Sequence, residues 1–266
     1  MKNMKNLKDT FCSLMYKTAR YRFLKYTSSD VNLGTDRNRQ INLEIEILTI
    51  AIEKHVNELK KSDKSSEKIN YFVNATEAIL NGNESIFPLP FNRSYWVIPG
   101  FLMAGEIPSA QSDSERIEKI KGIVDSGIRS VVNLIESEEC NFSGKKLIDY
   151  SDEMLKIAKE SEVELAINRF AIKDLDIPTV DFMVDILSHI KKDILEEKPV
   201  YVHCWGGIGR TGTTIGSFLI NEGICDVKEV IDFIKFLKRD TNIAHRDSPE
   251  TPDQVEFIQN WKPNFI

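Results

Sequence analysis

The sequence Val200-Tyr-Val-His-Cys-Trp-Gly-Gly-Ile-Gly-Arg-Thr-Gly-Thr213 is the stretch that decides the fold of this chain. It begins as an apolar, β-branched run, which predicts a buried strand that stops at His203. A glycine-rich turn follows, and a stretch with helical character begins near Arg210. A strand that enters such a turn and continues as a helix directs backbone N–H groups and the positive end of the helix dipole at one point, which suits an anion.

Cys204 and Arg210 lie at the two ends of this turn, six positions apart. A thiol is a nucleophile only as its thiolate, and a helix N-terminus, backbone N–H donors and an arginine all favour that charged form. The planar guanidinium of Arg210 suits two oxygens of one phosphate. Gly206, Gly207 and Gly209 would let the backbone come close to the same ligand. Together these groups predict that Cys204 attacks a phosphoryl group and forms a cysteinyl-phosphate.

The sequence on both sides of this stretch alternates strands with helices. We expect strands over residues 96–98, 102–104, 130–135, 165–172 and 200–202, and helices over 114–125, 151–159, 179–195, 213–221, 226–237 and from 251 onward. The first two strands are separated by Pro99-Gly100, which is typical of a hairpin. The alternation predicts an α/β fold with a central, mostly parallel sheet flanked by helices. In such sheets ligands bind at the carboxyl ends of strands, where Cys204 falls.

Residues 1–85 have a different pattern, and we expect an N-terminal helical extension there, with the catalytic domain over residues 86–266. The spacing within residues 1–27 is helical and places Met4, Leu7, Phe11, Leu14 and Met15 on one side. Residues 28–40 are polar and predict a loop. Residues 41–59 begin with strand-like alternation but keep a helical spacing for about 20 residues, which favours a helix. A further helix over residues 69–80 would end at Asn81-Gly82.

Charge is divided unevenly between these two parts. Residues 1–90 carry 14 Lys and Arg against 11 Asp and Glu, whereas the remaining residues carry 21 against 30. The basic first helix therefore fits docking on the acidic catalytic half, or alternatively contact with a partner or a membrane surface. The net charge of −6 gives no general reason to expect nucleic-acid binding.

Cysteine usage and hydropathy point to a cytoplasmic protein. The four cysteines, at positions 12, 140, 204 and 225, are widely spaced and form no C-x-x-C pair, which fits a reducing compartment. No apolar run approaches the ~18–20 residues of a membrane span. The N-terminal residues lack the continuous apolar core of a signal peptide.

A cysteinyl-phosphate mechanism also needs a proton donor for the leaving oxygen. Asp174 and Asp176 both lie in Lys173-Asp-Leu-Asp-Ile-Pro178, just after a predicted strand and before a helix. Asp174 is the predicted general acid, and Asp176 competes for the role. The alternative interpretation of both is a solvated turn with helix-capping carboxylates, which would be favoured if Cys204 were absent.

Several other polar residues have two interpretations. Thr211 either donates a hydrogen bond to the thiolate or is simply in the first turn of a helix. Gln254 either positions the hydrolytic water or belongs to a capping box in Thr251-Pro-Asp-Gln254. His203 is expected to be a buried residue that shapes the loop rather than a base. His245 and Arg246 are expected in a solvated loop, although they could reach a substrate.

A dinucleotide site is the main rival, because Gly207-Ile-Gly-Arg-Thr-Gly212 also reads G-x-G-x-x-G after a strand. Only 54 residues follow Gly212, and they offer no second strand with an acid at its end to bind a ribose. The fingerprint also leaves Cys204 and Arg210 unexplained. A nucleotide P-loop is excluded by the absence of Gly-Lys-Ser/Thr.

At residues His203-Cys204-x5-Arg210-Thr211-Gly212 the sequence resembles the cysteine-dependent protein tyrosine and dual-specificity phosphatases. The strings YWVIPGFLMAGEIP, GIRSVVNLIE and SPETPDQ look like the bacterial branch of that family, so the resemblance covers about residues 94–262. It implies Cys204 as nucleophile, Asp174 as general acid, Thr211 as an assisting residue and Gln254 as a residue that orders water, without metal or other cofactor. It implies a phosphate cradle made of the backbone amides of Trp205, Gly206, Gly207, Ile208, Gly209 and Arg210, with the Arg210 side chain on the phosphate.

The resemblance leaves the substrate open. The sequence has no phosphotyrosine-clamping motif like that of the large tyrosine-specific enzymes, so phosphoserine and phosphothreonine are also candidates. The loop lacks the lysines of the lipid-phosphatase branch, which disfavours polyanionic inositol lipids. We therefore expect a phosphoprotein substrate. Phosphatases of small metabolites such as an inositol phosphate or nucleotide, non-catalytic phosphate-binding adaptors, and sulfur-transfer or arsenate-reducing enzymes are the alternatives. The intact set of Cys204, Arg210 and Asp174 argues against the last two.

Overall fold

The computed structural model describes residues 2–30, 34–62, 66–83, 87–141 and 143–263, with side chains from residue 7 onward. The chain divides into two compact units. One comprises Met1–Phe87 together with Glu222–Cys225, and the other comprises Pro88–Asn221 and Asp226–Ile266. The first unit ends at Phe87, two residues after the boundary expected from the sequence. The segment Glu222–Cys225 also belongs to this first unit.

The first unit is built from three helices, α1 (Lys2–Thr27), α2 (Thr35–Lys60) and α3 (Glu67–Leu80). The prediction of a loop as far as residue 40 is wrong, because α2 already begins at Thr35. The helical spacing of the following residues explains this, since Ile41, Ile52, Val56 and Leu59 are buried on one face of α2. Helix α3 begins at the N-cap Ser66, whose hydroxyl accepts from the Ile69 N–H, and it ends at Asn81 before Gly82, as the stop signal predicted.

The predicted inner side of α1 is largely confirmed. Phe11, Leu14 and Met15 are buried, and Leu7 is partly exposed. The ring of Phe11 contacts Phe72 of α3 edge to face, at 5.7 Å between centroids. The Met4 side chain lies outside the described residues. The first unit is therefore held by apolar packing between its helices.

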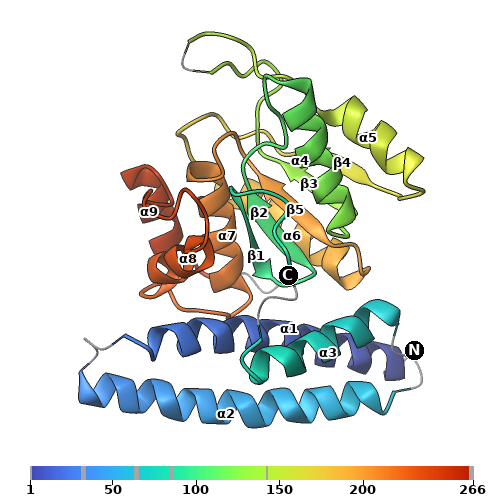
Figure 1. The fold of residues 1–266 in the computed structure, drawn as a ribbon. Helices are drawn as coiled ribbons and strands as arrows, with labels where there is room; N and C mark the ends of the chain where they lie inside the picture. Colours follow the sequence, from blue (N-terminus) through green and yellow to red (C-terminus); the bar gives the residue numbers. More distant parts are fainter. Residues whose placement is uncertain (1, 31–33, 63–65, 84–86, 142, 264–266) are drawn as a thin grey trace. The chain divides into compact units, whose positions relative to one another are not determined.

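The second unit is organised around one five-stranded sheet (Figure 1). Its strands are β1 (Ser94–Ile98), β2 (Leu102–Gly105), β3 (Ser130–Asn133), β4 (Ala166–Arg169) and β5 (Val200–His203), in the order β1-β2-β5-β3-β4. The pairs β2–β5, β5–β3 and β3–β4 are parallel, and β1 pairs antiparallel with β2 as the predicted hairpin. The expected mostly parallel α/β sheet is confirmed. Strands β3 and β4 are shorter than predicted. The apolar Leu134 and Ile135 after β3 are buried in a loop, and β4 is followed by a half-buried Phe170, an exposed Ala171 and a buried Ile172.

Helices cover both faces of this sheet. The chain passes from β2 to β3 through α4 (Asp113–Asp125) and from β3 to β4 through α5 (Ser151–Glu160). Both connections run toward the β4 edge of the sheet. Helix α6 (Val180–Leu195) returns the chain to the central strand β5, and α7 (Gly209–Asn221) follows β5 and packs on α6. Because parallel crossovers are right-handed, α4 and α5 lie on one face and α6 and α7 on the other.

Two short helices complete the unit, α8 (Val230–Lys238) and α9 (Pro252–Gln259), both of which pack near α7. The prediction that a helix begins at Asp226 is wrong, because the Asp226 carboxylate accepts from the N–H groups of Lys228 and Glu229 and holds a turn there. Helix α9 begins with the predicted capping box at Thr251. None of the helices described in either unit is both long and apolar enough to cross a membrane.

Candidate active site

The carboxyl ends of four strands meet at one edge of the sheet. The last residues of these strands are neighbours, because Gly105 pairs with His203, His203 with Asn133 and Asn133 with Arg169. Cys204 follows β5 directly and is only 3% exposed. The predicted nucleophile therefore lies at the carboxyl edge of the sheet, where the loops that leave all four strands can reach it.

The loop of residues 204–210 is fixed by close backbone approaches. Gly207 has a φ of +70°, and a Cβ there would lie 2.5 Å from the Gly105 carbonyl carbon. A Cβ on Gly209 would lie 2.9 Å from Oε1 of Gln254. The Ile208 carbonyl accepts from the Ser248 hydroxyl at 2.8 Å. The loop therefore needs glycine for conformation at one position and for space at both.

Thr211 fastens the nucleophile's own backbone. Its Oγ1 accepts from the Cys204 N–H at 2.8 Å and donates to the Gly105 carbonyl at 3.5 Å. The hydroxyl is fully buried. The hydrogen bond from Thr211 to the Cys204 sulfur, expected from the sequence, stays a prediction.

Glu139 is the functional residue that sequence reasoning missed. It lies in the loop after β3 and is buried, and its carboxylate binds the Arg210 guanidinium at both ends, with Nη1–Oε2 at 2.6 Å and Nη2–Oε1 at 2.7 Å. The Arg210 side chain is also buried and donates from Nη1 to the Ile172 carbonyl at 2.9 Å. Burial lowers the pKa of Arg210, but the hydrogen bonds that it donates to Glu139 and the negative charges of Cys204, Glu139 and Asp174 raise it overall. Arg210 is thus held as a cation beside the nucleophile.

Asp174 reaches the same guanidinium. Its Oδ1 accepts from Arg210 Nη2 at 2.8 Å, and its side chain is 37% exposed. Asp176 is exposed, and its carboxylate instead accepts from the adjacent Ile177 N–H. Of the two aspartates that the sequence left in competition, Asp174 is the one that the loop brings to Arg210.

His203 is locked as a neutral residue behind the loop. Its Nδ1 lies 3.1 Å from the Cys204 carbonyl, which can only accept, so Nδ1 carries the proton. Its Nε2 therefore accepts from the Tyr150 hydroxyl at 2.5 Å. Burial lowers the pKa of His203 to about 3, and burial raises the pKa of Tyr150. His203 therefore supports the Cys204 backbone and does not act as a base near neutral pH, as the sequence predicted.

Gln254 is fully buried and connects α9 to the loop that carries Asp174. Its Oε1 accepts from the N–H groups of Glu250 and Thr251, which completes the capping box, and its Nε2 donates to the Asp176 carbonyl at 3.1 Å. The capping interpretation of Gln254 is therefore confirmed. Its role in positioning water stays a prediction.

A cavity of about 230 Å³ opens above Cys204. Its walls include Trp205, Gly206, Ile208, Gly209, Arg210, Asp174, Leu175, Ile107 and Gln254. Of the predicted phosphate cradle, only Gly207 is absent from this lining.

Two arginines also border the cavity, and each already contacts a carboxylate: Arg93 pairs with Glu106 at 3.2 Å and Arg246 with Glu250 at 2.7 Å. His245 is exposed in the neighbouring loop.

Part of this unit matches a described protein family. Residues 109–224 match the family model "Tc-R-P: Polymorphic toxin system, DSP-PTPase phosphatase". The chain is 37% identical over 87 residues to an uncharacterized protein of Methanocaldococcus jannaschii, a match that covers 33% of this chain and 49% of the relative. It is 27% identical over 156 residues to the protein tyrosine phosphatase domain-containing protein 1 of Mus musculus, covering 58% of this chain and 20% of that protein. The chain thus spans half or less of the length of these curated relatives.

A solved structure is also similar. The crystal structure of Tk-PTP in the active form shares 20% sequence identity and a TM-score of 0.46, and the alignment covers 64% of this chain and 97% of that chain.

Proposed function

Residues 109–224 of this chain belong to the cysteine-dependent protein tyrosine and dual-specificity phosphatase superfamily, and from this premise we propose that the protein hydrolyses phosphomonoesters on proteins through a cysteinyl-phosphate intermediate. The observation that carries the proposal is the arrangement around Arg210. The guanidinium donates two hydrogen bonds to the buried Glu139 carboxylate and one to the predicted acid Asp174. Arg210 also lies in the wall of the cavity that Cys204 lines.

In the first step the Cys204 thiolate attacks the phosphorus and the bond to the leaving oxygen breaks. Protonated Asp174 transfers its proton to that oxygen, so the product leaves as an alcohol or phenol. The loop amides and Arg210 stabilise the negative charge on the three equatorial oxygens, as preorganised donors do in a site shielded from water.

In the second step a water molecule attacks the phosphorus of the cysteinyl-phosphate. The Asp174 carboxylate accepts a proton from that water, the S–P bond breaks, and inorganic phosphate and the Cys204 thiolate are released. This step restores the proton that Asp174 gave up in the first. Gln254 lines the same cavity and is the residue that would orient the water.

Arg210 has one edge available for the substrate. A guanidinium has five N–H donors. Those on Nη1 bind Glu139 and the Ile172 carbonyl, whereas those on Nη2 bind Glu139 and Asp174. Nε has no acceptor among the described residues. A phosphate that takes two parallel hydrogen bonds from Nε and Nη2 would therefore replace the Asp174 carboxylate and free it to meet the leaving oxygen.

The charges at the cavity mouth favour a substrate with a single phosphate. Arg93 and Arg246 each contact one carboxylate, through Nη1 to Glu106 and through Nη2 to Glu250, and the Nε of Arg210 has no acceptor among the described residues. A substrate with several phosphates would need more positive charge than this mouth presents, because its added negative charges would face Glu106 and Glu250. Trp205, Leu175 and Ile107 offer apolar surface to the rest of the substrate.

The second candidate function is hydrolysis of a small phosphorylated metabolite. Arg93 and Arg246 border the cavity, and both would bind a second phosphate if it displaced their carboxylates. A non-catalytic phosphate-binding adaptor is disfavoured, because Cys204, Arg210 and Asp174 line one cavity together.

The test is hydrolysis of a generic aryl phosphate by the wild type and by Cys204→Ser, in buffer with chelator and without added metal. We expect Cys204→Ser to reduce kcat/KM to background, because the hydroxyl of serine is a far weaker nucleophile than a thiolate. Rapid acid quenching of the wild type with a labelled substrate should trap phosphate on Cys204. Undiminished hydrolysis by Cys204→Ser would refute the mechanism.

A further inference from the structure

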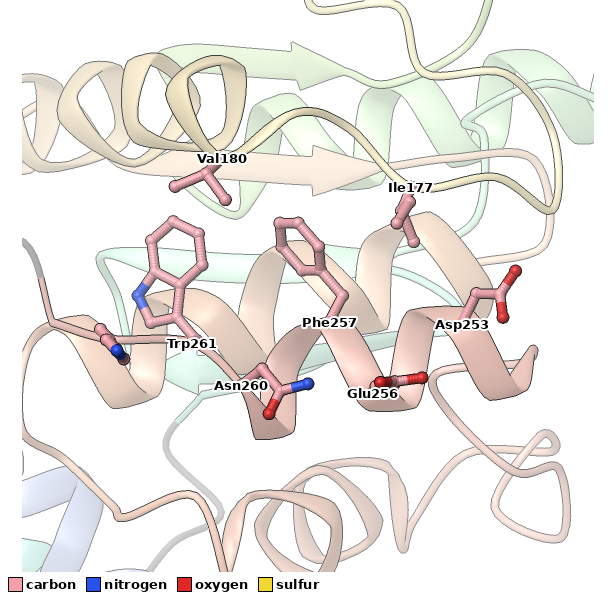
Figure 2. A pocket seen from close by; sticks show the side chains of 8 residues that line it. Ile177, Val180, Asp253, Glu256, Phe257, Asn260 and Trp261 are labelled. Atoms are coloured by element: carbon pink, nitrogen blue, oxygen red, sulfur yellow. The ribbon is translucent and has the colours of Figure 1, made fainter.

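A second depression lies next to the catalytic cavity and has no role in the mechanism above. It has a volume of about 550 Å³ and is lined by Ile177, Val180, Asp253, Glu256, Phe257, Asn260, Trp261 and Lys262. Figure 2 shows Ile177 and Val180 facing Phe257 and Trp261 across it. We call this the α9 groove, because one wall is helix α9 and the residues after it.

The α9 groove and the catalytic cavity share their walls. On one side Leu175 lines the cavity and Ile177 lines the groove. On the other side Gln254 lines the cavity and its neighbour Asp253 lines the groove. The hydrogen bond from Gln254 Nε2 to the Asp176 carbonyl joins the two walls between the two depressions. Leu175 and Ile177 are two residues apart, and two residues of extended chain span at most about 7 Å, so the two depressions are close neighbours. One extended substrate peptide can therefore occupy both.

The apolar part of the groove is partly exposed. Val180 is 53% exposed and Ile177 39%, although both come from the segment that leads from Asp174 into α6. The ring of Phe257 packs on Trp261 at 5.7 Å between centroids, so the opposite wall is a preformed aromatic surface. Such a surface suits a single apolar side chain of an occupant.

The charged residues of the groove determine which charge a bound side chain should carry. The groove is lined by two acidic residues, Asp253 and Glu256, and one basic residue, Lys262, so its acidic groups are in excess. Asp253 and Glu256 are exposed, and neither has an ion-pair partner among the described residues. Asp253 lies in the first turn of α9, where the helix dipole accounts for a carboxylate. Glu256 lies one turn further along, beyond that influence, and the residues after position 90 already carry an excess of acidic groups. An occupant with a basic side chain complements this wall.

We propose that the α9 groove binds the polypeptide segment next to the phosphorylated residue of the substrate, through one apolar side chain between Val180 and Phe257 and one Lys or Arg beside Glu256. This inference rests on the proposed function and deepens it, because it makes the substrate a phosphoprotein with apolar and basic residues close to its phosphate. A small metabolite would fill the catalytic cavity and leave the groove empty.

The test compares two phosphotyrosine peptides that differ only in their flanks. One carries Leu and Lys within four residues on both sides of the phosphotyrosine, and the other carries Ser and Glu at those positions. We expect the wild type to hydrolyse the Leu/Lys peptide with at least tenfold higher kcat/KM. Val180→Ser and Glu256→Lys should each lower kcat/KM for the Leu/Lys peptide by about three- to fivefold, because each removes one partly exposed contact.

Matched controls separate docking from folding and from chemistry. Leu155→Ser and Glu118→Lys change an exposed apolar and an exposed acidic residue on α5 and α4, away from the groove, and should leave both peptides unaffected. Hydrolysis of a generic aryl phosphate, which cannot reach the groove, should be unchanged in Val180→Ser and Glu256→Lys. Equal hydrolysis of the two peptides by the wild type, or an unaltered preference in both groove variants, would overturn the proposal.

A binding measurement distinguishes failure of this inference from failure of the proposed function. Fluorescence anisotropy of the labelled, unphosphorylated Leu/Lys peptide needs no turnover, and its affinity should fall in Val180→Ser and Glu256→Lys but not in the controls. Loss of this binding difference contradicts the docking proposal alone. Absence of Cys204-dependent aryl phosphate hydrolysis contradicts the proposed function, whatever the peptide binds.

Discussion

The loop of residues 204–210 and the loop of residues 170–178 meet at Arg210, but they are held in different ways. The first is buried, with its backbone fixed by Thr211, by the Ser248 hydroxyl and by close approaches at its glycines. The second is mostly exposed. Its first residues are fixed, because the Phe170 and Ile172 N–H groups donate to the Asn133 and Leu134 carbonyls, but beyond Asp174 its hydrogen bonds from the rest of the unit are one from Gln254 to the Asp176 carbonyl and a long one from Thr251, at 3.5 Å, to the Leu175 carbonyl, among the described residues.

The backbone of the second loop is also strained. Leu175, next to Asp174, has a φ of +62°, a region that costs a residue with a side chain of order 1 kcal/mol. A rigid cradle stabilises charge best when it does not reorganise during the reaction. The acid, in contrast, must leave Arg210 when the phosphate arrives, which a lightly tethered loop allows. The difference between the loops therefore matches the difference between their proposed tasks.

Glu139→Ala gives the largest expected effect, because it removes the carboxylate that holds the Arg210 guanidinium in the loop of residues 204–210. Removing one partner of a buried ion pair leaves Arg210 without its two-pronged support, so the free energy of unfolding should fall by about 3 kcal/mol. We expect kcat/KM for an aryl phosphate to fall by about 10³-fold, as the guanidinium loses its fixed orientation. Urea unfolding and steady-state kinetics measure the two effects.

The neighbouring Glu138→Ala is the matched control for this variant. Glu138 is exposed and pairs with Lys146 on the surface, so its loss should change neither quantity appreciably. If Glu139→Ala keeps near wild-type kcat/KM, Arg210 is oriented by its other contacts and the cradle is less dependent on this loop than the geometry indicates.

Glu139 also shows where sequence reasoning ends. Cys204 and Arg210 are predictable because six residues of local chain fix their separation, and the alternation of strands and helices is a local pattern too. Glu139 lies 71 positions before Arg210, in a polar segment that resembles any solvated loop. Its position after a predicted strand was a signal, but its burial arises only when β3 and β5 pair.

Asp174→Asn gives the next largest effect and tests the loop of residues 170–178. We expect kcat for an aryl phosphate to fall by about 10²-fold, because the leaving oxygen loses its proton donor. Inhibition by inorganic phosphate should strengthen in the same variant, since the neutral amide competes less well than a carboxylate for Arg210 Nη2. Activity and anion affinity thus move in opposite directions.

Asp176→Asn is the comparison for the acid. Among the described residues its carboxylate accepts only from the neighbouring Ile177 N–H, so we expect less than a threefold change in kcat. A slower Asp176→Asn than Asp174→Asn would move the acid by two residues. The sequence could not separate the two aspartates, because a turn of unknown conformation determines which side chain points inward, and here Leu175 with its positive φ reverses the chain between them.

Gln254→Ala should have a smaller effect, because it removes a hydrogen bond that holds the loop of residues 170–178. It removes the oxygen that accepts from the Glu250 and Thr251 N–H groups and the donor to the Asp176 carbonyl, which should lower the free energy of unfolding by about 1–2 kcal/mol and kcat by about fivefold. Gln259→Ala, at the exposed end of α9, is the control. Pre-steady-state kinetics separate tether from water positioning: if Gln254 orients the water, the variant accumulates cysteinyl-phosphate and shows a burst, whereas a pure tether slows both steps without one.

His203→Gln gives the smallest expected effect at neutral pH, and its effect on the pH dependence of the free energy of unfolding grows below neutral pH. It tests the residue that supports the backbone of Cys204. Burial holds the folded-state pKa of His203 at about 3, below the unfolded value of about 6.5, so folding requires the neutral ring. This contribution to stability is complete above pH 6.5 and is lost as the pH falls from 6.5 toward 3, by up to about 1.4 kcal/mol per pH unit. His203→Gln should therefore show a shallower loss of unfolding free energy between pH 6.5 and 4.5 than the wild type, and the exposed His245→Gln should follow the wild type. Parallel pH profiles for His203→Gln and the wild type would mean that His203 titrates normally, and that the hydrogen bond from Tyr150 does not hold the ring behind Cys204 as a neutral acceptor.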